Sequence, residues 1–80
     1  MRAYVLIEAS VGKVQIVYEG VRRLKLPQAA VAAVDIVTGP FDVIALLEAD
    51  DLDRVGQAIT DGIQKVEGVQ RTTTCLTLRL

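Results

Sequence analysis

The residues best suited to bind a small molecule lie in the segment Thr38-Gly39-Pro40-Phe41-Asp42 and in a run of three threonines at residues 72–74. A carboxylate accepts hydrogen bonds from an ammonium group, whereas hydroxyls and the amides of a glycine turn donate to a carboxylate. Together these groups would suit a small zwitterion. The alternative is a turn followed by an ordinary threonine-rich strand, and residue chemistry alone weighs the two interpretations equally.

The sequence lacks most of the residues that acid–base and nucleophilic catalysis use. The sequence has no histidine and one cysteine, so the commonest general base and the nitrogen ligands of zinc or copper are missing, and no intrachain disulfide can form. Ser10 is expected to cap a helix, and Cys75 is expected to be a small buried residue of a strand rather than a nucleophile. We therefore expect no catalytic residue, no metal and no cofactor.

Two clusters of charge have a structural interpretation. Asp50-Asp51 and Asp53 lack the spacing of a calcium-binding loop and are typical of the acidic first turn of a helix. Arg22-Arg23 and Lys25 would complement the dipole at the end of another helix, although cations there also suit an anion site. Neither cluster predicts a specific reaction.

The composition describes one domain over residues 1–80. Nine Lys and Arg oppose ten Asp and Glu, which gives a net charge of −1, and 51% of the residues are apolar. This balance lacks the basic excess that neutralises several phosphates, and no apolar stretch approaches the roughly 20 residues of a bilayer span. The short apolar run near Met1 does not resemble a signal peptide. We expect a cytoplasmic protein that neither enters a membrane nor binds DNA by itself.

The periodicity of apolar residues predicts four strands and two helices. In chain order these are a strand over residues 3–9, a helix over 14–24, strands over 31–38 and 41–49, a helix over 52–66 and a strand over 69–80. Pro27 would prevent continuation of the first helix, and Gly68 would cap the second. The order βαββαβ predicts an α+β, ferredoxin-like fold in which both helices cover one face of a four-stranded antiparallel sheet.

The sheet face that the helices cannot reach is predicted to be apolar. Its residues on two strands that this topology makes neighbours are Tyr4, Leu6, Ile44 and Leu46. Monomers rarely expose such a patch, and a short chain without a disulfide or a metal gains stability from a partner. We therefore expect the chain to pair through its sheet into a dimer; a chance scatter of surface aliphatic residues is the alternative.

Two blocks of the sequence resemble a known family. Residues 34–43, which contain Thr-Gly-Pro-Phe-Asp, and residues 66–74, which end in Arg-Thr-Thr-Thr, are similar to the effector-binding (RAM) domain of the leucine-responsive/asparagine regulator (Lrp/AsnC) family. The resemblance covers essentially the whole chain but not the helix-turn-helix of the full-length regulators. It departs from the family at Pro27-Gln28-Ala29-Ala30-Val31, which is longer than the usual Pro-Gly-Val turn and lacks its glycine.

The resemblance implies a stand-alone, non-enzymatic module of transcription regulation. Modules of this family dimerise through their sheets, the dimers form rings that are commonly octamers, and amino-acid effectors bind between dimers. Carried over by position, the effector-binding residues would be Gly39, Phe41, Asp42, Thr72 and Thr74. We expect a homo-oligomer that senses an amino acid and acts through full-length regulators.

Two alternatives remain open at this level. The first is a small dimeric α/β-barrel enzyme such as a monooxygenase, in which the apolar sheet face would line a substrate cavity; that face offers only Tyr4 as a polar group, which disfavours catalysis. The second is an assembly domain whose ligand site has decayed.

Overall fold

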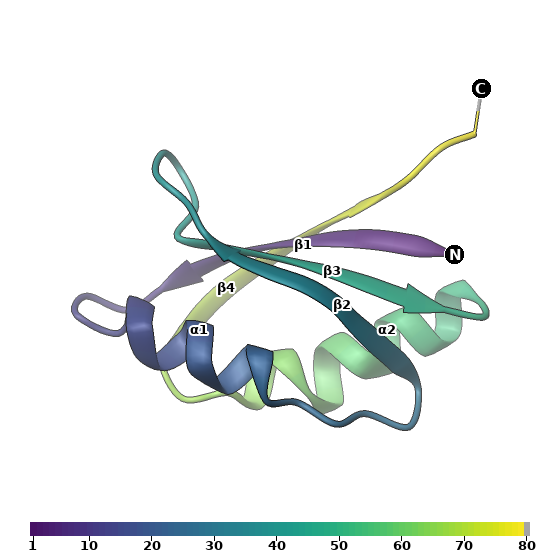
Figure 1. Cartoon of the computed structure of the whole chain (residues 1–80), viewed down its shortest axis with the longest axis horizontal. Helices are drawn as coiled ribbons and strands as arrows, with labels where there is room; N and C mark the ends of the chain where they lie inside the picture. Colours follow the sequence, from purple (N-terminus) through teal and green to yellow (C-terminus); the bar gives the residue numbers. More distant parts are fainter. Residues whose placement is uncertain (80) are drawn as a thin grey trace.

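The computed structural model describes residues 1–79 and places two helices on one face of a twisted sheet (Figure 1). The elements are β1 (Arg2–Ala9), α1 (Val14–Arg22), β2 (Ala29–Ile36), β3 (Val43–Ala49), α2 (Leu52–Asp61), a 3-10 turn η1 (Ile63–Lys65) and β4 (Val69–Leu76). The strand order is β2-β3-β1-β4, and every neighbouring pair is antiparallel. The predicted ferredoxin-like fold is confirmed; Leu80, which the predicted last strand included, lies outside the described residues.

The core lies between the sheet and the helices. Alternate residues of β1 and β3 are fully buried because the strand period of two sends them to the helix side. The helices add apolar residues at spacings of three and four to this layer. The buried residues are Ala3, Val5, Ile7, Val17, Val21, Val43, Ala45, Leu47, Val55, Ala58, Ile59 and Ile63.

The start of α1 differs from the prediction. The N-cap is Lys13, without a side-chain hydrogen bond, and the backbone N–H of Lys13 donates to the Ser10 carbonyl at 2.9 Å. The positive φ of Gly12, +78°, forms a tight turn there, so Ser10 lies too far from the helix to cap it. The role predicted for Ser10 was therefore wrong.

The start of α2 agrees with the prediction, but its end does not. Asp51 caps the helix by accepting a hydrogen bond from the Arg54 N–H at 2.8 Å. The α-helix ends at Asp61, and the apolar periodicity continues through η1. Gly68, with φ +91°, lies in the turn before β4 and does not cap α2.

Cys75 is exposed, contrary to the prediction that it is buried. It lies opposite Tyr4 in the β1–β4 pairing, on the face away from the helices. Because β4 is an edge strand, neither a helix nor a further strand covers the thiol. No helix within residues 1–79 is long and apolar enough to cross a membrane.

Candidate functional site

The turn between β2 and β3 is fixed by backbone hydrogen bonds. The Val37 N–H donates to the Asp42 carbonyl, and the Asp42 N–H donates to the Ile7 carbonyl, each at 2.9 Å. Gly39 has φ +125°, a region that glycine adopts without strain, and a Cβ built there would meet nothing within 4 Å. The turn therefore leaves open space beside its backbone, where a ligand can approach.

Asp42 is anchored inside the fold. Its Oδ2 accepts a hydrogen bond from the Ala9 N–H at 2.8 Å, at the point where the β1–β4 register shifts between Glu8 and Ala9. A register shift removes an amide from the strand ladder, and the carboxylate satisfies it. Among the described residues no hydrogen bond to the other oxygen of Asp42 is found.

Thr72 and Thr74 lie away from this carboxylate. They face the helix side of β4, opposite Ile7 and Val5, and Thr72 Oγ1 accepts a hydrogen bond from Gln64 Nε2 at 3.0 Å. Strand β1 separates β4 from β3, which places the two strands roughly 10 Å apart. Within one chain, the predicted ligand residues therefore form two groups, with Gly39, Phe41 and Asp42 in one and the threonines in the other.

The predicted apolar sheet face is present. Tyr4 lies opposite Leu46, and Leu6 lies opposite Ile44, on the side without helices. Tyr4 is 40% exposed, and the other three are partly exposed. We call these four residues, with Ala33 and Cys75 beside them, the open face.

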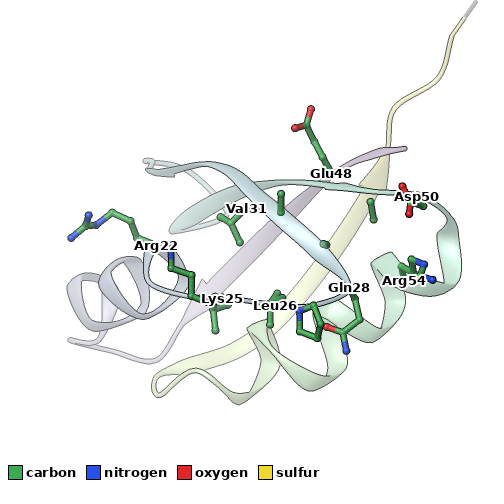
Figure 2. Close-up of a pocket in the computed structure, with 13 residues that line it drawn as sticks. Arg22, Lys25, Leu26, Gln28, Val31, Glu48, Asp50 and Arg54 are labelled. Atoms are coloured by element: carbon green, nitrogen blue, oxygen red, sulfur yellow. The ribbon is translucent and has the colours of Figure 1, made fainter.

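A corner cavity that the sequence did not predict lies at the start of β2 (Figure 2). It measures about 850 Å³ and lies between the α1–β2 loop and the β3–α2 turn; its lining includes Leu26, Gln28, Val31, Glu48, Asp50 and Arg54. Gln28 Oε1 is buried without a hydrogen-bond partner in the described part of the chain. The only hint in the sequence is the departure from the family pattern in this loop.

The cations at the end of α1 are partly engaged within their own helix. Arg22 Nη2 donates to Glu19 Oε2 at 2.8 Å, and Arg23 Nη2 lies 3.4 Å from the same oxygen. The hydrogen bond from Arg22 lowers the pKa of the Glu19 carboxyl and raises the pKa of the guanidinium. No cluster of three or more His, Cys, Asp or Glu suited to a metal occurs in residues 1–79.

Solved structures similar to this chain share its fold. A protein of Thermus thermophilus, TTHA0845, is 40% identical with a TM-score of 0.84, over 99% of this chain and 94% of that one. FFRP-DM1 is 28% identical with a TM-score of 0.80, over 96% and 97%. AsnC of E. coli is 15% identical with a TM-score of 0.83, and the match covers 99% of this chain but only 51% of that regulator.

The family comparison covers nearly the whole sequence. The model of the Lrp/AsnC ligand binding domain matches residues 2–80, whereas no curated protein matches the chain. The matched region includes the β2–β3 turn, the open face and β4. This chain therefore belongs to the Lrp/AsnC family, as a regulatory ligand-binding domain.

Proposed function

We propose that this chain, as a single module over residues 1–80, senses an amino acid, forms a homo-oligomer and influences transcription through full-length regulators of its family. The observation that carries the proposal is the match of the ligand-binding-domain model to residues 2–80, together with the open backbone at Gly39 and the remaining oxygen of Asp42. A structural neighbour, the regulator NMB0573 of Neisseria meningitidis, was solved as a complex with L-Met and is 18% identical to this chain.

The dimer of this proposal forms through the open face. Burying apolar side chains of this kind contributes about 25 cal/mol per Å² of surface removed from water. Two neighbouring strands present four large apolar side chains on one surface, and a symmetric pair of such surfaces covers both at once. The apolar face thus acts as an assembly surface.

The ligand site of this proposal lies between copies. Within a single chain, the Asp42 group lies apart from Thr72 and Thr74, because β1 lies between their strands. A second chain is therefore needed to bring an acceptor and hydroxyl donors to one ligand. The carboxylate of Asp42 would bind the ammonium, and the Gly39 turn with the threonines would bind the carboxylate. A ligand at such a site stabilises the higher assembly, a ring of dimers, because it binds that state preferentially.

Charge and topology support the part of the proposal that has the chain act through other regulators rather than by binding DNA itself. Both helices pack their apolar faces on the sheet (Figure 1), so neither is free to enter a DNA groove, and the net charge of −1 does not attract phosphates. We expect that the chain alone does not shift duplex DNA at physiological salt. A sequence-specific shift by this chain alone would contradict the proposal.

A ligand screen followed by calorimetry tests the sensing function. Each of the twenty amino acids is added in a thermal-shift assay, because a ligand that binds only the folded protein raises its melting temperature. The best one is titrated into the unaltered protein, Asp42→Asn and the control Asp61→Asn, which removes an exposed charge at the end of α2. We expect Asp42→Asn to weaken binding roughly 30- to 150-fold and the control to bind normally.

Two results would count against the proposal. Equal affinity of the unaltered and Asp42→Asn proteins would remove Asp42 from the site. A lack of binding by every amino acid would favour an assembly domain without a ligand.

A further inference from the structure

Strand β4 contains one more residue than β1 pairs with. The register of the two strands shifts by one residue between Glu8 and Ala9, and Gln70 is left without a partner on β1. An extra residue of this kind forms a β-bulge, which takes a backbone amide out of the ladder. That amide is the Ala9 N–H, which donates to Asp42 Oδ2 at 2.8 Å instead. A side chain from the β2–β3 turn therefore holds the bulge between β1 and β4.

The segment before the bulge is fixed against α1. The Ser10 N–H donates to the Gly68 carbonyl at 2.8 Å. Gly68 has φ +91°, and a Cβ built there would lie 2.8 Å from Lys13 Cβ, so glycine suits this close approach. The Lys13 ammonium also lies 3.5 Å from Glu67 Oε2. The chain that enters β4 is thus tied to the start of α1.

The segment after the bulge is fixed by a side-chain hydrogen bond. Gln64 Nε2 donates to Thr72 Oγ1 at 3.0 Å, while Thr72 lies opposite Ile7 on the helix side of the sheet. A shift of register by one residue moves the side chains of a strand to the other face. If the bulge moved along β4 past Thr72 and Thr74, both threonines would leave the helix side for the open face. The position of the bulge therefore decides on which face the two threonines lie.

Asp42 and Thr72 hold the same bulge from opposite sides. The carboxylate binds the β1 amide at the bulge, and the hydroxyl fixes β4 beyond it. The turn that carries Asp42 leads into β3, and β1 separates β3 from β4, so the bulge connects two residues that do not touch. Two sites that both favour one position of a two-state element are energetically coupled.

We propose that the β1–β4 bulge couples Asp42 to Thr72 and Thr74 within each chain, so that a ligand bound at one group raises the affinity at the other. This inference rests on the proposed function, in which each ligand site lies between copies. Each chain then contributes its Asp42 group to one site and its threonines to another. A ligand that binds the threonines on the helix side selects the observed bulge position, in which the Asp42 carboxylate is already held, and the effect is reciprocal.

Hydrogen exchange at the Ala9 amide tests the coupling without a ligand. Thr72→Val removes the hydroxyl that accepts from Gln64, and the matched control Thr77→Val removes a bonded hydroxyl beyond the far end of β4. Thr72→Val should speed exchange at Ala9 roughly three- to tenfold, because the bulge is then held from one side only. Thr77→Val should change it less than about twofold. The amide of Ala45, in the middle of β3, corrects for changes in global stability.

A double-mutant cycle provides the second readout. Asp42→Ala should speed exchange at Ala9 roughly ten- to a hundredfold, whereas Asp42→Asn, which keeps an acceptor, should stay within about threefold of the unaltered protein. In the Asp42→Ala background, Thr72→Val should add less than about twofold, because the bulge is already released. Independent residues would instead give fold-changes that multiply.

Cross-strand NMR contacts identify the position of the bulge. Glu8 lies opposite Arg71 in the observed register, and we expect a second population with Glu8 opposite Gln70 in the Asp42→Ala protein. Multiplying fold-changes with an unmoved bulge would overturn the coupling even if an amino acid binds. If Asp42→Ala does not fold, unchanged exchange at Ala9 in Thr72→Val overturns it alone. Coupling in a protein that binds no amino acid would overturn the proposed function and leave the coupling in place.

Discussion

At the scale of single residues, Asp42 makes one hydrogen bond that holds the fold and has one proposed role in ligand binding. One oxygen accepts a hydrogen bond from the Ala9 N–H at the register shift. For the other oxygen no hydrogen bond is found within residues 1–79. The sequence predicted a carboxylate near the turn but not its bond to Ala9, because that bond depends on a shift in the register of β1 against β4. A substitution of Asp42 therefore tests the fold as well as the ligand site.

The hydrogen bond to Ala9 predicts different effects on stability for two substitutions of Asp42. Asp42→Ala leaves the partly buried Ala9 amide without an acceptor and should lower the free energy of unfolding by about 1–3 kcal/mol. Asp42→Asn retains an amide oxygen and should cost less than about 1 kcal/mol. Urea denaturation of both variants measures this difference, and equal destabilisation by the two would show that the hydrogen bond to Ala9 is not the main contribution of Asp42.

Other local features were predictable from residue type when their partners lie close in the sequence. Features that depend on residues or strands elsewhere in the fold were not. The Asp51 cap was predictable because an acidic residue directly before an amphipathic run has a local partner, the Arg54 N–H. The exposure of Cys75 was not, since it depends on the position of β4 at the edge of the sheet. Ser10 failed as a cap because Gly12 turns the chain between Ser10 and the helix.

At the scale of elements, the order and type were predictable from periodicity, but the ends were not. The stripe of α2 continues over Ile63 and Val66, so apolar spacing alone cannot show that the α-helix ends at Asp61. The position of α1 relative to the segment after η1 depends on close packing at Gly20. A Cβ at Gly20 would lie 2.5 Å from Val66 Cγ1, so only glycine allows this approach without a shift of Val66.

Two glycine substitutions separate helix propensity from packing. Gly56→Ala, where a Cβ meets nothing within 4 Å, should raise the free energy of unfolding by about 0.5–1 kcal/mol, because alanine favours the helix. Gly20→Ala gains the same propensity but forces Val66 to move, and it should lower the free energy by about 1–3 kcal/mol. Thermal or urea unfolding compares them. If both substitutions raise the free energy of unfolding, Val66 can move away from the new Cβ without loss of packing energy.

At the scale of the whole molecule, the surfaces on which the proposed function depends were predictable only in part. The apolar open face was predictable, since alternation places residues on one side of two strands whose pairing follows from topology. The corner cavity was not, because it arises where the α1–β2 loop meets the β3–α2 turn, two segments distant in sequence. The separation of Asp42 from Thr72 also appears only once β1 is placed between β3 and β4.

The native thiol of Cys75 reports whether the open face is covered. In the single chain the thiol is exposed, whereas in the proposed dimer it would lie between two sheets. Its reaction with an aromatic disulfide reagent should therefore slow as the protein concentration passes the dimer dissociation constant. Leu46→Asp buries an unpaired charge in the interface and should give a monomer whose thiol reacts rapidly at every concentration.

The control is Leu52→Asp, which places the same charge on α2, outside the open face. It should dimerise and protect the thiol as the unaltered protein does, and circular dichroism should show that both variants remain folded. Light scattering of the unaltered protein supplies the mass. A dimer mass combined with a thiol whose reactivity does not depend on concentration would place the interface on another surface. Cys75 pairs with Tyr4 on the open face, so an interface through that face should cover its thiol.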